Sequence, residues 1–320
     1  MLKFSPRIVD ASRSAEQVQV TLMRADLAAR IERLVRKDGA FPTAIPRFRL
    51  GRISRVEHPV HTVFEPALCV IAQGSKRVLL GDEVYVYDAS HYLVFAQNLP
   101  VSGQVVDASP EAPHLALRLD FEVKEIAALA LELGLTARPV STVQRGIYTA
   151  ELSTALLEPL LRLVRLLESP EDIAALAPLA TREILYRLLK SPDGARLAQL
   201  AMVGSHSQRI ALAIGRLRKR YREALRIEDL ADEVHLSVSA LHHHFKAATA
   251  MSPLQYQKQL RLQEARRIML SEHIEAAVAG HRVGYESQSQ FNREYSRFFG
   301  APPARDIKRL REQQVRGMSG

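Results

Sequence analysis

The spacing of apolar residues changes twice along the chain and divides it into regions of different expected structure. Residues 16 to 38 carry Val20, Leu27, Ile31 and Leu34 at helical intervals, after which the segment FPTAIPRF interrupts the pattern. From there to about residue 121 the apolar residues form short runs, and in the next seventy or so residues the helical spacing returns. We therefore expect a helix, then strands, then further helices.

The middle region contains five short apolar runs, namely ALCVIAQ, KRVLLGDEVYVY, HYLVFAQ, SGQVV and LALRLDF. Clusters of Gly, Pro, Asp and Asn separate them, and Gly81, Asp82 and Glu83 inside the second run have the composition of a hairpin turn. Several short strands at this spacing predict a β-sandwich or a small barrel.

The segment ELSTALLEPLLRLVRLLES is apolar around most of its circumference when it is drawn as a helix. Glu158, Arg162 and Arg165 make only a narrow charged stripe. Such a helix has more than one surface to bury, which favours packing on its own domain and on a second subunit. Burial within one chain is the alternative, and the pattern does not separate the two. The next segment, SPDGARLAQLAMVGSHSQ, is expected to be a linker.

Charge adds to this picture because most of the basic excess lies in the last third of the chain. Residues 205 to 320 hold 20 Lys and Arg against 12 Asp and Glu, whereas residues 1 to 204 hold 24 against 23. A basic region of this kind favours a polyanionic partner such as nucleic acid. A solvated basic face would give the same count, so a motif has to decide between the two.

A helix-turn-helix pattern occurs twice in this basic region, in LADEVHLSVSALHHHFKAATAMSPLQY and in AGHRVGYESQSQFNREYSRFFGAPPARD. In each copy a short helix is expected to end at a valine, Val234 or Val283. Ser237 or Ser287 is then placed to cap the following helix. Ser287 is followed three residues later by Gln290, which predicts a capping box in the second copy.

The second helix of each copy is expected to have an apolar face and a polar face. In the second copy the apolar face consists of Phe291, Tyr295 and Phe298. Polar side chains then point outward near the helix N-terminus, where a recognition helix touches base edges. Arg can bind guanine bidentately, and Asn or Gln can bind adenine in the same way. The predicted DNA-binding residues are Ser239, His242, His243, Gln288, Ser289, Asn292 and Arg293.

The segment between the two copies predicts a long helix that begins with Ser252 as N-cap and Pro253 as first helical residue. Residues 253 to 270 would span about 27 Å at 1.5 Å per residue. A rigid spacer of this length could hold the two recognition helices near the roughly 34 Å separation of successive major grooves on one face of DNA. One chain could thus read a bipartite site.

Residues 205 to 320 resemble the DNA-binding domain of AraC-type transcriptional regulators through LADEVHLSVSALHHHFK, SPLQYQKQLRLQEARR and RVGYESQSQFNREYSRFFGAPP. Residues 60 to 125 resemble the cupin-like effector domain at the N-terminus of one branch of that family, especially in the segment ALCVIAQGSKRVLLGDEVYVYDASHYLVFAQNLPVSGQVV. Three positions depart from the family pattern. His235 and Ala250 stand where the family usually has glycine, and Gly280 stands where it usually has alanine.

The resemblance implies an α+β chain in three regions. Residues 1 to 45 would form an N-terminal helical extension, and residues 46 to 195 a cupin-like β-barrel or sandwich with flanking helices that binds an effector and dimerises. Residues 205 to 320 would form an all-α domain of two helix-turn-helix units joined by a linker helix. The expected function is sequence-specific transcriptional regulation gated by a small molecule, with no cofactor.

The expected partners are double-stranded promoter DNA, an unidentified small-molecule effector and a second copy of the chain, with RNA polymerase as a further candidate. Two other function classes stay open. One is a constitutive DNA-binding regulator whose barrel only dimerises. The other is a cupin metalloenzyme, which the sequence disfavours because the histidines of the barrel region are scattered, without an H-x-H pair or an accompanying Glu. These histidines are His58, His61, His91 and His114.

The run of three histidines at 242 to 244 does not predict a metal site either, because consecutive helix positions diverge by about 100°. Cys69, in the run ALCVIA, has two interpretations. It is a small buried core residue, or it is a thiol that senses an electrophilic effector such as an aldehyde, which would need a lowered pKa.

The single cysteine excludes an internal disulfide and fits a reducing compartment. The first residues, MLKFSPRIVDASRSAEQ, are charged throughout and lack the apolar core of a signal peptide. No run approaches the roughly 18 apolar residues of a membrane span. We therefore expect a cytoplasmic protein.

Overall fold

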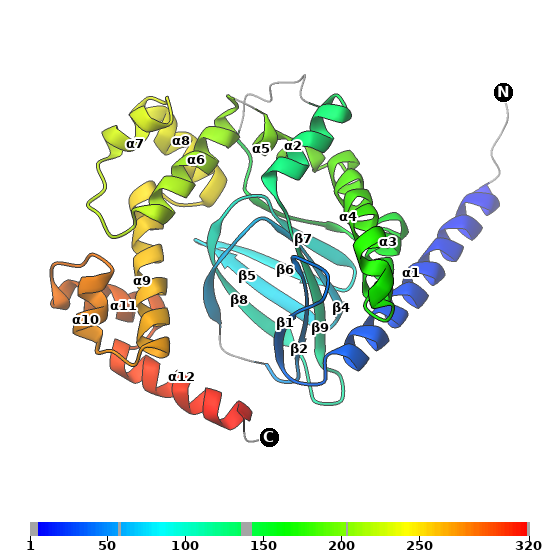
Figure 1. The fold of residues 1–320 in the computed structure, drawn as a ribbon, viewed down its shortest axis with the longest axis horizontal. Helices are drawn as coiled ribbons and strands as arrows, with labels where there is room; N and C mark the ends of the chain where they lie inside the picture. The colour runs from blue at the N-terminus through cyan, green and yellow to red at the C-terminus, as the bar shows by residue number, and fades with distance from the viewer. Residues whose placement is uncertain (1–5, 57–58, 136–142, 203, 319–320) are drawn as a thin grey trace.

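The computed structural model describes residues 6–56, 59–135, 143–202 and 204–318. Two antiparallel β-sheets form a sandwich at its centre, with one group of helices on one side and a second, C-terminal group on the other (Figure 1). This α+β arrangement, a β-sandwich with flanking helices followed by an all-helical region, confirms the fold class predicted from the sequence. None of the described helices combines the length and the apolarity that crossing a bilayer requires.

The strands pair in two sheets of order β1-β2-β9-β4-β7-β10 and β3-β8-β5-β6. The expected turn between β5 and β6 is present, and Gly81 adopts a φ of 59°, which a residue without a side chain accommodates most easily. The strands are β1 (Gly39–Pro42), β2 (Phe48–Ile53), β3 (Val60–Phe64), β4 (Ala67–Gln73), β5 (Ser75–Leu80), β6 (Glu83–Asp88), β7 (His91–Phe95), β8 (Leu99–Asp107), β9 (His114–Asp120) and β10 (Ile147–Glu151).

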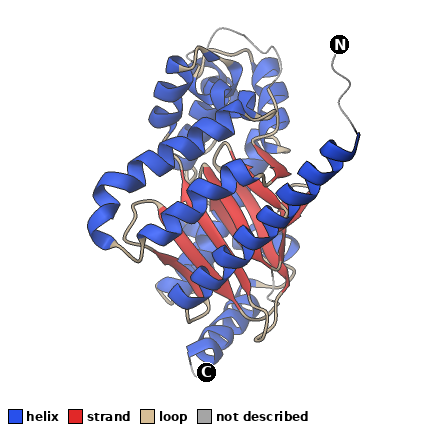
Figure 2. Ribbon diagram, turned by 90° about the vertical axis from the view of Figure 1, so that its right-hand side faces the viewer, coloured by secondary structure: helices blue, strands red, loops and turns tan. Residues whose placement is uncertain are grey.

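Alternation of side chains along the strands creates two separate hydrophobic layers. On β4, Leu68 and Val70 pack into the layer outside the six-stranded sheet, whereas Cys69 and Ile71 point into the space between the sheets. The outer layer is completed by helices that cross the face of the sheet, with the N-terminal end of α1 projecting beyond it (Figure 2). These helices are α1 (Pro6–Leu34), α2 (Val123–Glu132), α3 (Thr154–Leu166), α4 (Ile173–Lys190) and α5 (Gly194–Ala201), with a 3-10 turn η2 (Pro170–Asp172) before α4.

Helix α3 is the strongly apolar helix of the sequence, and it is buried within this chain. It lies between α1 and α4, and its leucines Leu157, Leu160 and Leu163 have no exposed surface. The arrangement therefore matches the one-chain alternative, because α3 itself leaves no apolar surface for a second subunit.

Two elements differ from the sequence-based expectation. The region from 122 to 190 is not wholly helical, since β10 completes the six-stranded sheet beside β7. The expected linker contains helix α5, whose Leu197, Ala198 and Leu200 are buried in the outer layer. Gly and Asp at its start are typical of turns, which is why a linker was expected, and contact with α2 stabilises the helix.

The C-terminal region is helical and consists of seven helices among the described residues. They are α6 (His206–Lys219), α7 (Ile227–Glu233), α8 (Val238–Thr249), α9 (Pro253–Ser271), α10 (Ala276–Arg282), α11 (Gln288–Phe299) and α12 (Pro303–Met318). The layer between the sheets continues into this region, so that Phe95 and Ile147 of the sandwich belong to one cluster with Ile214, Phe245 and Tyr256.

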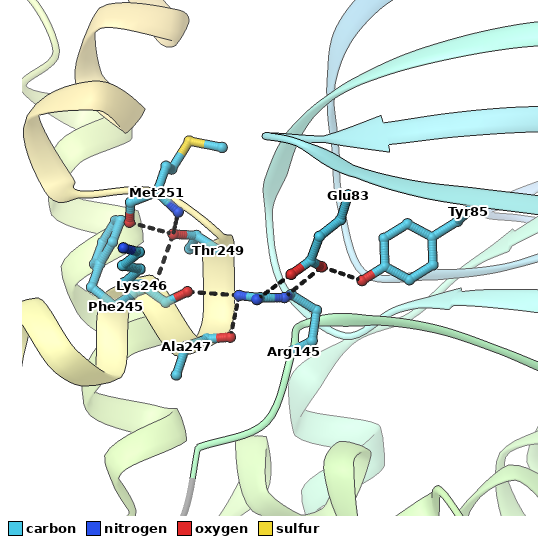
Figure 3. A network of polar contacts seen from close by, with 8 residues as sticks. All are labelled: Glu83, Tyr85, Arg145, Phe245, Lys246, Ala247, Thr249 and Met251. Atoms are coloured by element: carbon cyan, nitrogen blue, oxygen red, sulfur yellow. Dashed lines mark hydrogen bonds and ion pairs between the residues drawn. The ribbon is translucent and has the colours of Figure 1, made fainter.

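A polar contact beside this shared core joins the sandwich to the end of α8 (Figure 3). Arg145 donates hydrogen bonds to the main-chain carbonyls of Lys246 (2.6 Å) and Ala247 and, through Nε, to Glu83 (2.9 Å). Tyr85 donates a further hydrogen bond to Glu83 (2.7 Å). Burial would raise the pKa of Glu83, but the hydrogen bonds from Arg145 and Tyr85 outweigh it and hold this pKa below its usual value. A guanidinium at the C-terminal end of a helix also interacts favourably with the helix dipole.

Other contacts between the two regions lie on either side of Arg145. Gly146 N donates to the carbonyl of Ala248 (2.9 Å), and the Tyr256 hydroxyl donates to the carbonyl of Asn98 (2.9 Å). On β3, the ring of His61 lies 4.9 Å from that of Phe298 on α11. The sandwich therefore touches both halves of the helical region.

Replacing Arg145 should destabilise the full-length chain. Arg145→Met would leave Glu83 and two carbonyls without their donor, so we expect the free energy of unfolding to fall by about 1 to 2 kcal/mol, allowing for partial exposure of the pair. The full decrease in the free energy of unfolding should be present above pH 4.5, the ordinary pKa of a glutamate. The decrease should become smaller as the pH falls through the lowered pKa of Glu83, because protonated Glu83 no longer pairs with Arg145 in the wild type. Denaturant titrations at pH 7 and pH 3.5 measure both effects.

Arg77→Met is the matched control, because Arg77 is exposed on β5 and has no hydrogen-bond or ion-pair partner among the described residues. An equal loss of stability in both variants would contradict the role assigned to Arg145.

Candidate DNA-binding surface

The first helix-turn-helix unit consists of α7 and α8. Helix α7 ends at Val234, and the Ser237 side chain accepts a hydrogen bond from the main-chain N–H of Ala240 at the start of α8. Leu241 and Phe245 are fully buried beneath α8. Both helix boundaries confirm the sequence prediction, since a serine cap and an apolar face at i and i+4 are local signals.

The second unit consists of α10 and α11. Helix α10 ends at Val283, and Ser287 accepts a hydrogen bond from the N–H of Gln290. The predicted capping box is only half formed. The Gln290 side chain donates to Glu294 (3.4 Å) instead of turning back to the main chain of Ser287.

The core below α11 differs from the prediction by one residue. Phe291 and Tyr295 are fully buried, and the third aromatic side chain in this core is Phe299, which is 8% exposed. Phe298, which was expected there, is partly buried: it packs against the edge of this core and also contacts His61 of the sandwich. At about 100° per residue Phe298 lies roughly 20° from Phe291 around the helix axis and Phe299 roughly 80°, so periodicity alone favours Phe298. Tertiary contacts, with His61 of β3 beside Phe298, decide which ring is fully buried.

Helix α9 connects the two units and belongs to both of their cores. It begins with Ser252 and Pro253 as expected, and Ser252 and Gln255 form a complete capping box. Tyr256 and Leu260 lie in the core of the first unit, whereas Leu262 and Met269 lie in that of the second. Because one straight helix is fixed in both cores, the two units have a defined relative position.

The outward faces of α8 and α11 carry most of the predicted DNA-binding residues. Asn292 is the exception, since it is partly buried and its side-chain oxygen has no hydrogen-bond partner. Arg293 is exposed and has no ion-pair partner among the described residues, while Glu294 is paired with Lys258 (3.0 Å). The exposed residues of the predicted set are Ser239, His242, His243, Gln288, Ser289 and Arg293.

The three consecutive histidines of α8 point in different directions. His242 and His243 are exposed, whereas His244 turns towards α6 and stacks on His206 with 4.1 Å between the ring centres. Burial, followed by the charges of His206 and His243, lowers the pKa of His244. Over the described ranges no three His, Cys, Asp or Glu side chains are grouped so that they could hold a metal ion.

The barrel-region histidines are likewise separated. His61 lies against α11, His91 pairs with Asp88 (3.3 Å), and His114 is buried between the sheets. His58 lies outside the described residues.

Two positions where the family usually has glycine adopt left-handed backbone here. His235 has a φ of 54° and Ala250 a φ of 60°, so each pays a conformational cost that glycine would avoid. His235 and Ala250 thus adopt left-handed backbone without a glycine. At Gly280, where the family usually has alanine, this chain has no room for a side chain. A Cβ at this position would lie 2.9 Å from Cγ of Phe291.

Cys69 points into the space between the sheets and is 8% exposed. Burial raises the pKa of its thiol, and the positive charges of Arg118 and Lys76 act in the opposite direction. A buried thiol with a raised pKa is a weak nucleophile. In this conformation the geometry fits a core residue better than a reactive sensor.

The contacts of Arg145, Asn98 and His61 with the helical region were not predicted from the sequence. Each of these residues lies in or beside a strand and contacts a helix more than a hundred residues away. No local spacing signals such a contact. A different feature could have been predicted, namely the inward position of Lys76 in the strand SKRVLL, since Val78 and Leu80 mark the inner face.

Family models match both regions of the chain. The model described as "AraC-type transcriptional regulator N-terminus" matches residues 44–196, and the one described as "Helix-turn-helix domain" matches residues 230–309. Together they account for more than two thirds of the chain.

Curated relatives include the HTH-type transcriptional activator RhaS of Pectobacterium carotovorum subsp. carotovorum (strain PC1), which is 31% identical over 146 residues. The aligned part is 46% of this chain and 49% of that protein, so the chain spans about half the length of the curated relatives it matches. RhaS of Escherichia coli O1:K1 / APEC is 29% identical over 160 residues, 49% of this chain and 56% of that protein.

Among solved structures, the chain resembles wild-type ToxT from Vibrio cholerae strain SCE256 bound to an unsaturated fatty acid, with a TM-score of 0.55 and 11% identity. The match covers 85% of this chain and 96% of that one. ToxT from Vibrio cholerae O395 bound to (E)-4-(8-methylnaphthalen-1-yl)but-3-enoic acid gives a TM-score of 0.55, 10% identity and coverage of 82% and 98%. These likenesses concern the fold alone. The two family models, which together cover more than two thirds of the chain, show that it belongs to the AraC-type transcriptional regulators.

Proposed function

We propose that this protein is a sequence-specific DNA-binding transcriptional regulator whose affinity for DNA is set by a small molecule bound in the sandwich region. The observation that carries the proposal is the pair of helices α8 and α11, each fixed by buried aromatic or aliphatic side chains and each presenting exposed polar residues. RhaS, a relative over about half its length, is named as a transcriptional activator. We place no catalytic step in the chain.

We assign a function to each of the regions expected from the sequence. Residues 205 to 320 bind promoter DNA, residues 46 to 195 bind the effector and dimerise, and residues 1 to 45 form an extension. The exposed residues of α8 and α11 read base edges, and Arg293 is the strongest candidate because its unpaired guanidinium can bind guanine bidentately. Asn292 would need to rotate outward before it could contact a base.

Gating by the sandwich is supported by its contacts with both recognition helices. Arg145 holds the C-terminal end of α8, and His61 packs against Phe298 of α11. A molecule that displaces either contact would change the freedom of a DNA-reading helix. The proposal further places the protein in the cytoplasm, where promoter DNA is found, with RNA polymerase as a candidate partner. A regulator that binds DNA constitutively would show these contacts as well, and would differ by having no response to any ligand.

Loss of Arg293 should weaken DNA reading without unfolding the protein. Duplexes that bind the full-length chain can be selected from a random library, and their affinity should fall steeply as salt rises, because phosphate contacts release counterions. Arg293→Ala should cost about 1 to 3 kcal/mol of affinity for the selected site and relax the preference at one base pair. His242→Ala should cost less, since a neutral imidazole offers one donor and one acceptor.

Arg297→Ala is the matched control, because Arg297 is exposed on the same helix one turn further from its N-terminus. Phe291→Ala should behave differently again and lower the stability of the domain by about 3 to 5 kcal/mol, with loss of all DNA binding. Unchanged affinity and base preference in a normally folded Arg293→Ala protein would show that another face reads the DNA.

We also propose that the protein dimerises, and the structure favours α4 over α3 as the contact surface. Leu176 and Leu179 on α4 are 42% and 62% exposed, and α4 lies on the side of the molecule opposite the helix-turn-helix units (Figure 1). The stretch of α4 around these leucines carries no charge, which is typical of an interface.

A charge in this patch should dissociate the dimer. Leu179→Asp should raise the dissociation constant at least tenfold, about 1.4 kcal/mol, in sedimentation velocity at micromolar concentration. Leu212→Asp is the control, since Leu212 is similarly exposed but lies on α6. A wild-type protein that sediments only as a monomer would remove this part of the proposal.

A further inference from the structure

The space between the two sheets contains a lysine that has no anionic partner. Lys76 occupies an inward position on β5, as shown by Val78 and Leu80 two and four residues further along, which are buried in the inner cluster. Its cross-strand neighbours are Tyr87 on β6 and Val105 on β8. Both of these side chains are buried, whereas Lys76 itself is only partly buried, so the lysine stem lies against an apolar layer.

The ammonium group lies close to the backbone of β8. A Cβ built on Gly103 would approach Cε of Lys76 to 3.1 Å and Nζ to 3.6 Å, so the missing side chain of this glycine leaves room for the lysine. The ammonium also lies 5.5 Å from the centre of the Phe64 ring. These contacts fix the lysine head inside the sandwich without supplying a negative charge.

The local charges do not balance. Arg118, whose guanidinium lies 4.6 Å from the same Phe64 ring, is neutralised by Asp120 at 2.5 Å. Among the described residues no carboxylate lies within 4 Å of the Lys76 ammonium. Burial lowers the pKa of Lys76, since an ammonium without a partner is poorly solvated there. One positive charge between the sheets is therefore uncompensated.

A second polar group nearby is also without a partner. His114 on β9 is 3% exposed, and its Nδ1 makes no hydrogen bond. Burial, followed by the charge of Lys76, lowers the pKa of His114 to about 4. A neutral imidazole can donate a hydrogen bond to an anion without adding charge.

This end of the inner face can be reached from solvent. Val60 and Thr62 on β3 lie opposite Gly103 and Val101, and therefore share their inner face. Val60 is nevertheless 55% exposed, and Thr62 is exposed as well. The other end of β5 lies against the helical region, because a Cβ built on Gly81 would approach the carbonyl oxygen of Ala250 to 3.3 Å.

We infer that the effector site of the proposed regulator lies between the sheets at Lys76 and takes an organic monocarboxylate with an apolar body. The carboxylate would pair with the Lys76 ammonium and accept a hydrogen bond from His114. The apolar body would lie against Phe64, Val78 and Val101. A monoanion fits better than a phosphate dianion, because one cation is uncompensated and the remaining lining is apolar.

The test uses the full-length protein and pairs of ligands that differ only in charge. Hexanoate, octanoate, benzoate and phenylacetate are titrated calorimetrically at pH 7.5 beside the amide of each acid. We expect at least one acid to bind at least tenfold more tightly than its amide. Lys76→Met should reduce the affinity for that acid to the level of the amide, while Arg77→Met, on the outward face of the same strand, should leave it unchanged.

A second readout does not depend on the choice of acid. The ligand-free Lys76→Met protein should melt at the same or a higher temperature than the wild type, because an unpaired and partly buried charge is replaced by an apolar side chain of similar length. A melting temperature lowered by more than that of Arg77→Met, equal binding of acid and amide, no binding of any of the four acids, or unchanged binding by Lys76→Met would each overturn the inference.

The inference rests on the proposed function, and the two can fail separately. Binding of the selected DNA by the wild-type chain is measured without added acid. Absence of DNA binding would count against the regulator itself. DNA binding together with no response to the acids would count against the Lys76 site alone.

Discussion

The hydrophobic cluster between the two sheets continues without interruption into the first helix-turn-helix unit, and the position of every candidate DNA-binding residue depends on this shared core. Phe95 and Ile147 of the sandwich pack in the same cluster as Phe245 beneath α8 and Tyr256 of α9. Separating the two regions would expose these side chains to water, at roughly 25 cal/mol for each Å² of apolar surface. The sandwich and the first recognition helix therefore behave as one packed body in this conformation.

Helix α9 transmits that position to the second unit. Its first half is fixed in the shared core and its second half in the core that holds Phe291, Tyr295 and Phe299. At the second core, Asp306 has no exposed surface and accepts hydrogen bonds from Tyr295 and Arg266. Because these groups would be costly to leave unpaired, the orientation of α11 is as well determined as that of α8.

The recognition helices and the sandwich each contain a cation without an ion-pair partner among the described residues, but the surroundings of the two cations differ. On α8 and α11 the polar side chains face solvent, where an unpaired Arg293 costs little and remains free to bind a polyanion. Between the sheets the same lack of a partner at Lys76 is less favourable, since its side chain lies against an apolar layer and is partly buried. An unpaired cation on the surface and an unpaired cation in the interior thus indicate two different kinds of ligand.

The sequence by itself determined the features that depend on neighbouring residues. Helix ends at Val234 and Val283 and serine caps at Ser237 and Ser287 all follow from side chains a few positions apart. Only the tertiary structure decided which surfaces meet. It buried α3 within its own chain, placed Phe298 against His61, set Arg145 at the end of α8 and left Lys76 without a counter-charge. The physical reason is that caps and periodicity are local, whereas burial and charge pairing depend on groups that the fold brings together from distant parts of the chain.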